Sequence, residues 1–462
     1  MCAAVSAAAL AAARCTNTPP AALPSATPPP ASDTLRDLSD IRNVVVIFME
    51  NRSFDMLYGL FPGANGIPPS SAIAPQRDRD GSVLRELPPI WSGLTARSVK
   101  PAITEAQTAH LPNAPFAIDD PNGFNASLSV PTRDLVHRFY QNQMQIDGGR
   151  NDRFVAYSDA GALSMGHYDG SKLPMWPIAR EFTLADNFFM GAFGGSFLNH
   201  IYLICACIPR YPNADTSPAK PSIAIVNPDG VSLTLAANSP ASAIDGPPKY
   251  VKDGNLTPDF YAVNTMQPPY QPSENAPAKG QDRRYTDPGK PTTLPPQTEQ
   301  TIGDLLSAKG ISWAWYGGAW QETLNRRNRP LTVKFTYHHQ PFNYFAALAP
   351  GTKARAEHLR DGGVDGRQFL AAIDAGRLPE VAFYKPQSAL NEHPGSTDVQ
   401  SGDTHAADII AHLRRSPQWA HMLVVVTYDE NGGEWDHVAP PKGDRWGPGS
   451  RIPAIIISPY AR

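Results

Sequence analysis

The chain has 462 residues, and 41% of them are hydrophobic, which is enough for a large core in one big domain or in two or three smaller ones. Its 40 Lys and Arg residues and 43 Asp and Glu residues leave a net charge of -3, so no basic excess points to nucleic acid as a partner. The 48 prolines predict long ordered loops over a scaffold rather than a helical bundle.

The first 36 residues resemble a secretory signal followed by a disordered linker. An alanine-rich stretch that includes Leu10 has the apolar character of a signal core, although a basic region before it is missing. The residues up to about Pro30 are rich in Ala, Pro, Ser and Thr, which is typical of a disordered linker. We expect a periplasmic or secreted protein, with a lipid anchor as a further option and a disordered cytoplasmic tail as the alternative. No run is long enough to form a stable membrane span.

Five apolar stretches in the remaining sequence predict buried strands. They cover residues 43–49, 311–317, 380–384, 422–428 and 452–458. Their near-continuous and often β-branched apolar character fits a parallel sheet that is covered on both faces. A helix with Asp403 or Thr404 as its cap and with Ile409, Ile410 and Leu413 on one face precedes the fourth strand. Strands that alternate with helices predict an α/β three-layer sandwich with a mostly parallel central sheet.

We expect one domain over residues 37–462, with an irregular insertion at about 212–296. The insertion is rich in Pro, Asn, Asp, Ser and Gly and has weak periodicity, so it should be partly β and partly irregular. The last predicted strand is followed at once by the end of the sequence. Because a closing helix would normally cover such a strand, a truncated C-terminus is a further expectation.

Two of the four cysteines lie in the body of the chain. Cys2 and Cys15 belong to the signal-like segment, whereas Cys205 and Cys207 lie in the apolar run LICACIP. A disulfide between cysteines with this spacing would be strained, so we expect two buried thiols.

Polar side chains directly follow two of the predicted strands. Glu50 and Asn51 come after the first strand, and Asp429 and Glu430 come after the fourth. In open α/β sheets, ligands bind at the carboxyl ends of the strands, so these side chains can converge on one point. Three carboxylates at one site repel one another, and a divalent cation that prefers oxygen ligands relieves this repulsion. One such pair would only suggest a cap, but two pairs in the same placement favour a metal site.

Ser196 lies in the stretch GAFGGSFLNHIYLICA, after two glycines and before a run with helical character. A serine at a helix N-terminus faces free N–H groups and the positive end of the helix dipole. This environment suits phosphate binding or a nucleophile, whereas a plain helix cap is the alternative. Leu198 occupies the position of the second glycine in a Gly-x-Ser-x-Gly elbow, which excludes the α/β-hydrolase pattern.

Histidines in loop-like contexts form the last set of candidates: His110, His338, His339, His393 and His437. None has the His-Glu-x-x-His spacing of a zinc protease. A single loop histidine is usually solvated, but several in one site would hold a phosphate and protonate a leaving group.

Together, these motifs resemble those of a known family. The stretches ENRSFD, GGSFLNH, HHQPF and YDENGGEWDHV look like the bacterial phosphoesterase family. That family joins secreted acid phosphatases of the Francisella type with non-haemolytic phospholipases C, within the alkaline phosphatase superfamily. The similarity spans residues 40 to 460 or so, and it implies an alkaline-phosphatase-like sandwich with long loop insertions.

The resemblance also implies roles for individual residues. It implies one divalent metal ion of unspecified identity, bound by Glu50, Asn51, Ser196, Asp429 and Glu430. Glu430 stands where the acid phosphatase branch has Asp. It implies catalytic roles for Ser196, His339 and His393, and substrate binding by His110, His338 and Asn199. No role carries over to His437.

The implied reaction is the hydrolysis of phosphate esters through a phosphoserine on Ser196, with an acid phosphatase acting on phosphomonoesters as the favoured reading. The alternative is a phospholipase C that binds phospholipid head groups and cleaves phospholipid phosphodiesters, a branch that usually carries extra C-terminal β domains. A sulfatase would need the spacing C/S-x-P-x-R, which the sequence from Cys205 to Arg210 does not match. A non-catalytic, metal-stabilised binding protein is a more distant alternative. Histidines that must be cationic to hold phosphate predict activity below neutral pH.

Overall fold

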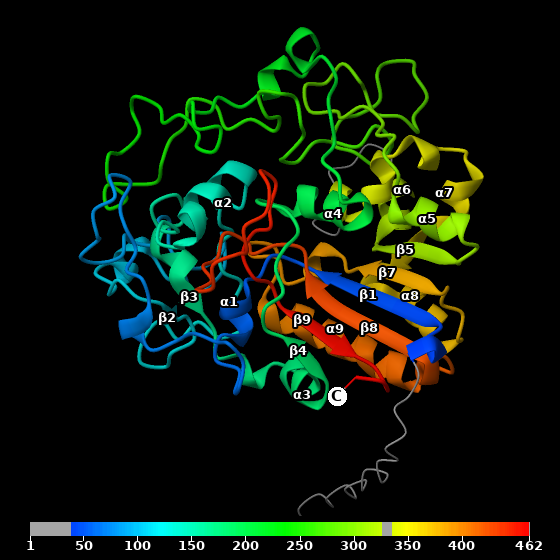
Figure 1. The fold of residues 1–462 in the computed structure, drawn as a ribbon, viewed down its shortest axis with the longest axis horizontal. Helices are drawn as coiled ribbons and strands as arrows, with labels where there is room; N and C mark the ends of the chain where they lie inside the picture. The colour runs from blue at the N-terminus through cyan, green and yellow to red at the C-terminus, as the bar shows by residue number, and fades with distance from the viewer. Residues whose placement is uncertain (1–37, 326–334, 462) are drawn as a thin grey trace, which may run out of the picture. The chain divides into compact units, whose positions relative to one another are not determined.

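A seven-stranded mixed sheet organises the computed structural model, which describes residues 38–325 and 335–461 (Figure 1). The strands lie in the order β4-β9-β8-β1-β7-β5-β6. Their bounds are Thr183–Ala185 (β4), Ala454–Ile457 (β9), Met422–Tyr428 (β8), Asn43–Met49 (β1), Val381–Lys385 (β7), Trp313–Gly318 (β5) and Leu359–Gly363 (β6). A second pair, β2 (Phe116–Ala117) and β3 (Gly166–His167), is separate from it. The predicted signal-like segment lies outside the described residues.

Five neighbouring strands, from β8 through β1, β7 and β5 to β6, are parallel, which confirms the predicted α/β class. β1 pairs with β8 in continuous register from Asn43 opposite Met422 to Met49 opposite Tyr428. On its other side β1 pairs with β7, with Val44 opposite Val381. Because β1 and β8 end at the same level, the residues that follow them leave the sheet at the same edge.

The predicted sheet is mostly parallel, and β9 is one of its antiparallel strands. β9 runs antiparallel to β8, with Val426 opposite Ile455, and antiparallel to β4. The described chain between β8 and β9 contains no helix, and a parallel neighbour would need a long crossover connection. A continuous apolar run signals burial on both faces but not the direction of the strand, so the sequence alone did not reveal this reversal.

Helices cover both faces of the sheet, each over its own hydrophobic cluster. One cluster joins Val45 and Ile47 to α8 and α9, and the other joins Phe48 and Trp315 to α4. The helices are α1 (Phe54–Tyr58), α2 (Phe139–Ile146), α3 (Met175–Glu181), α4 (Ser196–Cys205), α5 (Ile302–Ala308), α6 (Trp320–Asn325), α7 (Lys353–His358), α8 (Arg367–Asp374) and α9 (Val399–Arg415). The predicted three-layer arrangement is therefore present. No helix in the described ranges combines the length and apolar character needed to cross a bilayer.

Helix α9 begins earlier than its predicted cap. Asp398 is the N-cap, and its side chain accepts a hydrogen bond from Ser401 N at 2.7 Å. Asp403 instead lies inside the helix, buried, and accepts from Met175 N at 2.8 Å. Both aspartates are good caps in sequence, and the structure uses the first of them.

The long segment between α4 and α5 is irregular. After η8 (Lys220–Ser222), the described chain up to α5 contains isolated bridges such as Val226 to Leu233 and Leu235 to Tyr250. It runs along the upper edge of the view in green (Figure 1). The predicted insertion at 212–296 falls within this segment.

The prediction of two free thiols is wrong. Cys205 and Cys207 form a disulfide at the end of α4. Ala206 between them adopts a left-handed conformation with φ 48°, which turns the chain back. The two Cα atoms are 5.1 Å apart, within the range that a disulfide bridges.

Candidate active site

The predicted metal ligands and Ser196 converge at the carboxyl ends of β1 and β8. Ser196 Oγ lies 3.3 Å from Glu50 Oε2, 3.2 Å from Asn51 Oδ1 and 3.4 Å from Glu430 Oε1. Asp429 Oδ1 accepts from Asn51 N at 3.0 Å and from Glu430 N at 2.9 Å. All five side chains are buried, so four polar residues from two strand ends surround one serine hydroxyl.

Two glycines allow Ser196 to reach this position at the start of α4. Gly194 has φ +90°, and a Cβ there would lie 2.4 Å from Phe139 N. A Cβ on Gly195 would lie 2.4 Å from His137 O. Only residues without a side chain let the loop approach the segment that carries His137 and Phe139 so closely.

The structure places Asn199 differently from its predicted substrate-binding role. Its amide donates to Ala192 O at 3.1 Å and Gly195 O at 3.3 Å, and its oxygen accepts from Ala192 N at 3.0 Å. Because these backbone groups occupy the amide, Asn199 fixes the loop before Ser196.

Three basic side chains surround Glu50. Lys385 Nζ, at the end of β7, lies 2.7 Å from Glu50 Oε1 and donates to Met49 O at 2.9 Å. His339 Nε2 lies 2.5 Å from the same Glu50 oxygen. His200 lies one turn after Ser196 in α4, with Nδ1 2.8 Å from Ser196 O and Nε2 4.0 Å from Glu50 Oε1.

Sequence reasoning missed Lys385 and His200, although signals for both exist. Lys385 ends an apolar strand, which is the placement that singled out Glu50. His200 stands four residues after Ser196, so a helix places both on one face.

His137 is a further residue that the sequence analysis missed. Its Nε2 lies 3.2 Å from Asn51 Nδ2 and 3.8 Å from Glu430 Oε1, and its Nδ1 lies 2.6 Å from Leu135 O. The ring of His393 faces it at a centroid distance of 5.6 Å. His137 therefore connects the metal-ligand candidates to the predicted catalytic His393.

His110 does not belong to this cluster. Its side chain is 82% exposed and forms an ion pair with Glu86 at 3.0 Å. The structure thus corrects the expectation that His110 lines the phosphate site, and it brings His137 there instead. A loop histidine next to proline is a weak signal, because surface turns share the same composition.

The acidic side chains shift one another's pKa values. Burial and the nearby Glu50 raise the pKa of Asp429 to about 7. Burial and Asp429 raise the pKa of Glu430 well above its ordinary value. Burial also opposes ionisation of Glu50, but Lys385 and His339 outweigh it and hold the pKa of Glu50 well below its usual range. The protein alone therefore does not keep all three carboxylates ionised.

This donor set fits a divalent cation. The candidate ligands offer carboxylate, carboxamide and hydroxyl oxygens, which hard cations prefer. Asp429 Oδ2 is buried and has no hydrogen-bond partner among the described residues. Oxygen atoms of Glu50 and Asp429 also lie within 4.8 Å of a His200 nitrogen, in a group compact enough to surround an ion.

Burial disfavours the cationic form of three histidines here, which goes against the premise of a positively charged histidine clamp. Burial lowers the pKa values of His200 and His338 well below the ordinary value and that of His339 to about 4. His393 differs, because Asp134 and Glu50 outweigh the effect of burial and raise its pKa. Of these four histidines, His393 is therefore the one suited to act as an acid.

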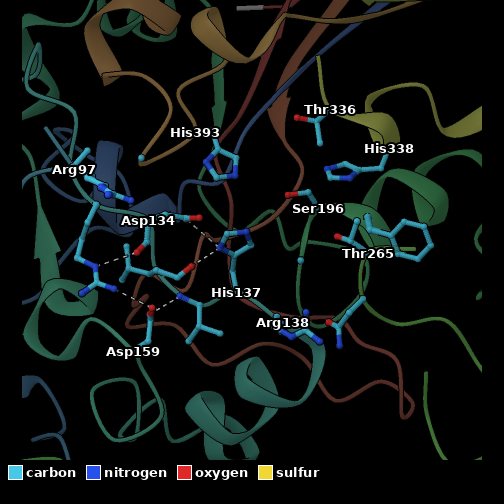
Figure 2. Close-up of a pocket in the computed structure, with 18 of the residues that line it drawn as sticks. Arg97, Asp134, His137, Arg138, Asp159, Ser196, Thr265, Thr336, His338 and His393 are labelled. Carbon is cyan, nitrogen blue, oxygen red and sulfur yellow. Dashed lines mark hydrogen bonds and ion pairs between the residues drawn. The ribbon is translucent and has the colours of Figure 1, made fainter. Parts of the chain in front are cut away.

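A cavity of about 950 Å³ opens over Ser196. His137, His338, His339 and His393 line it together with Ser196. In Figure 2, Ser196 lies between His137 and His393 on one side and Thr336 and His338 on the other. A ligand in this cavity can therefore reach the serine and the histidines at once.

A serine among buried carboxylates, at the strand ends of an α/β sheet and below a polar cavity, is an arrangement that suits a hydrolase. The sequence model of the Phosphoesterase family matches residues 41–462, and the chain belongs to this family. This confirms the resemblance found in the motifs and makes phosphoric ester hydrolysis the class of reaction.

Several curated proteins are similar over most of the chain. Phospholipase C A of Mycobacterium tuberculosis is 24% identical over 92% of this chain and 69% of its own length. Non-hemolytic phospholipase C of Pseudomonas aeruginosa is 22% identical over 96% of this chain and 54% of its own length. Among solved structures, a protein in the alkaline phosphatase superfamily from Vibrio parahaemolyticus aligns with 34% of this chain and 41% of its own, at 15% identity. Its TM-score of 0.20 is too low to establish a common fold.

Proposed function

We propose that this chain hydrolyses phosphoric esters with Ser196 as the nucleophile, and that phosphodiesters of the kind cleaved by phospholipases C are its substrates. The observation that carries the proposal is the position of Ser196 Oγ, within 3.4 Å of oxygen atoms of Glu50, Asn51 and Glu430. The names of the similar proteins support the diester over the monoester that the motifs favoured.

The proposal includes a divalent cation held by Glu50, Asn51, Asp429, Glu430 and Ser196. When bound, such an ion lowers the pKa of a serine hydroxyl and neutralises charge on phosphate oxygens. Burial and mutual repulsion raise the pKa values of Asp429 and Glu430, and a bound cation would offset both effects and allow the two carboxylates to ionise.

The residues of the chain then carry out the transfer. Ser196 Oγ attacks phosphorus while the bond to the leaving alcohol breaks, and the serine proton passes to a neighbouring carboxylate, of which Glu430, with its raised pKa and with Oε1 3.4 Å away, is a stronger base than Glu50. His393, with its raised pKa, donates a proton to the leaving alcohol. Water later attacks the phosphoserine, which releases phosphate or its monoester and restores Ser196.

A phosphomonoesterase is the second candidate. Its support is the sequence stretch GGSFLNH and the predominance of polar side chains in the cavity. A non-catalytic, metal-stabilised binding protein has less support, because such a protein does not require a serine hydroxyl in contact with the carboxylates.

The test is hydrolysis of p-nitrophenyl phosphorylcholine and p-nitrophenyl phosphate between pH 4 and pH 9. Wild type, Ser196→Ala and the exposed control Ser129→Ala are compared with chelator and after metal is restored. Diester turnover that Ser196→Ala and chelator both abolish supports the proposal. Preference for the monoester selects the second candidate. If the metal-loaded wild type hydrolyses neither substrate, the result favours the hypothesis of a non-catalytic binding protein.

A further inference from the structure

We propose that the outer part of the cavity contains a subsite for a second anionic group of the substrate, and that Arg97 binds this group. The inference rests on the proposed function and deepens it. It names the substrates as phosphoric esters that carry a further carboxylate or phosphate, beyond the phosphorus that Ser196 attacks. Arg97 would then determine specificity rather than take part in the chemical step.

The other two arginines that line the cavity are already paired. Arg133 Nη2 lies 3.0 Å from Asp159 Oδ2, and Asp159 Oδ1 also accepts from Val136 N at 2.7 Å. Arg138 Nε lies 2.8 Å from Asp253 Oδ2 in the irregular segment. Their charges are therefore compensated by carboxylates of the protein.

Arg97 is different. It lines the cavity and is exposed, and within the described ranges its guanidinium has neither a hydrogen bond nor an ion pair. Asp134, the remaining carboxylate of the lining, faces His137 Nδ1 at 3.5 Å. Among the charged groups of the lining, Arg97 is thus the cation without a carboxylate partner in the part of the chain described.

Backbone contacts hold the residues before Arg97 against the segment that leads to His137. Ala96 N donates to Pro131 O at 2.9 Å, and Thr95 forms a bridge with Thr132. The chain from Thr132 leads directly to His137. Figure 2 shows Arg97 on the same side as Asp134, across the cavity from Thr336 and His338. A substrate bound at Ser196 could therefore extend toward Arg97.

The chemistry of the lining favours an anion at this place over a quaternary ammonium group. A guanidinium presents a planar fork of donors that matches carboxylate and phosphate. Choline-like cations are held by cages of aromatic rings, and Phe197 is the one Phe, Tyr or Trp among the described lining residues. A cavity with an unpaired arginine and one such ring suits an anionic head group.

The experiment measures binding of phosphonates, which contain a carbon–phosphorus bond that the enzyme does not hydrolyse. ω-Carboxyalkyl phosphonates with chains of two, four and six carbons are compared with ω-hydroxyalkyl phosphonates of equal length. Dissociation constants are measured by calorimetry for the metal-loaded full chain. The variants are Arg97→Gln and Arg85→Gln, the latter being an exposed arginine outside the cavity lining.

We expect wild type and Arg85→Gln to prefer the carboxylate about tenfold at the chain length that matches the subsite, as a charge-assisted hydrogen bond would give. Arg97→Gln should remove this preference and leave the affinity for the hydroxyalkyl series unchanged. Absence of a preference at every length in wild type, or its survival in Arg97→Gln, would overturn the subsite. Equal weakening of both series would also overturn it, since Arg97 would then bind the phosphorus group itself. Because binding is measured without turnover, these outcomes are separate from a failure of the proposed reaction.

Discussion

Lys385 Nζ lies 2.7 Å from Glu50 Oε1, and both side chains are fully buried. Lys385 ends β7 and Glu50 follows β1, so the ends of two neighbouring strands form the pair. The ammonium group is the largest of the contributions that keep the pKa of Glu50 low against the effect of burial. Lys385, the last residue of a sheet strand, thus favours the ionised form of Glu50, which is a candidate metal ligand.

Lys385→Met should lower the free energy of unfolding by about 3–5 kcal/mol, because it leaves a buried carboxylate with less compensation. Since Lys385 lowers the pKa of Glu50, the loss should be largest near neutral pH and shrink as acid protonates Glu50. Urea denaturation with chelator at several pH values measures it. Lys353→Met, which removes an exposed lysine paired with Glu357, serves as the control and should change little.

His137→Ala should reduce kcat/KM by about 10²-fold, the scale expected when a group that acts on protons or phosphate oxygens is removed. The reason is its contact with Asn51 Nδ2 at 3.2 Å, next to Ser196. His110→Ala should leave kcat/KM unchanged, since the His110 side chain is 82% exposed and contacts Glu86 outside the candidate site. Steady-state kinetics on the better p-nitrophenyl substrate compares them. The reverse order of effects would restore His110 to the site and exclude His137.

Gly194→Ala should cost both stability and activity, whereas Gly63→Ala should cost stability only. Both glycines have positive φ, +90° and +86°, so alanine is strained by about 1 kcal/mol or more at either position. A Cβ at Gly194 would also lie 2.4 Å from Phe139 N, whereas none of the described atoms lies within 4 Å at Gly63. Thermal unfolding and kcat measured together separate the two effects. A kcat for Gly194→Ala equal to that of wild type would show that Ser196 tolerates displacement of its loop.

Asp403→Asn should stabilise the protein relative to wild type at pH 8 but not at pH 4. Burial raises the pKa of Asp403 to about 7, while Met175 N, which donates to it, partly opposes this. A carboxyl group with a raised pKa in the fold stabilises fully below its unfolded pKa and loses this contribution as pH rises through about 7. The difference between the two pH values should reach up to about 4 kcal/mol.

Asparagine keeps an oxygen that can accept from Met175 N, so the substitution removes the charge and retains the bond. Urea denaturation of wild type, Asp403→Asn and the exposed control Asp215→Asn measures the effect. A stability difference between Asp403→Asn and wild type that does not change with pH would contradict the assignment of a buried, protonated Asp403.

The sequence predicted the centre of the sheet well and its edge less well. β1 and β8 have their predicted bounds, because each is a continuous apolar run that ends at polar residues. The antiparallel direction of β9 depends on the path of the chain after β8, which no local pattern encodes. α9 begins at the cap Asp398, whereas Asp403 lies inside the helix and accepts a hydrogen bond from Met175 N, and the local sequence alone does not distinguish the two aspartates.

The metal-ligand candidates could be predicted because they follow strands whose ends had clear signals. The motifs implied that Ser196 and Glu50 lie together, and Ser196 Oγ is 3.3 Å from Glu50 Oε2. Lys385 has the same placement but was passed over, and His137 lies outside the predicted strands. A lysine at a strand end usually reaches solvent, and a histidine in a stretch without periodicity carries no information about what it will face.

The pairing of β1 with β8 has a consequence for the way the protein is made. Asn51 N donates to Asp429 Oδ1 across 378 positions of sequence, and Ser196 lies between them in the chain. During synthesis, the ribosome releases Glu50 and Ser196 long before Asp429 and Glu430 emerge. The candidate site therefore cannot assemble before residues 429 and 430 have left the ribosome, so this group of side chains is absent while the first 428 residues are being made.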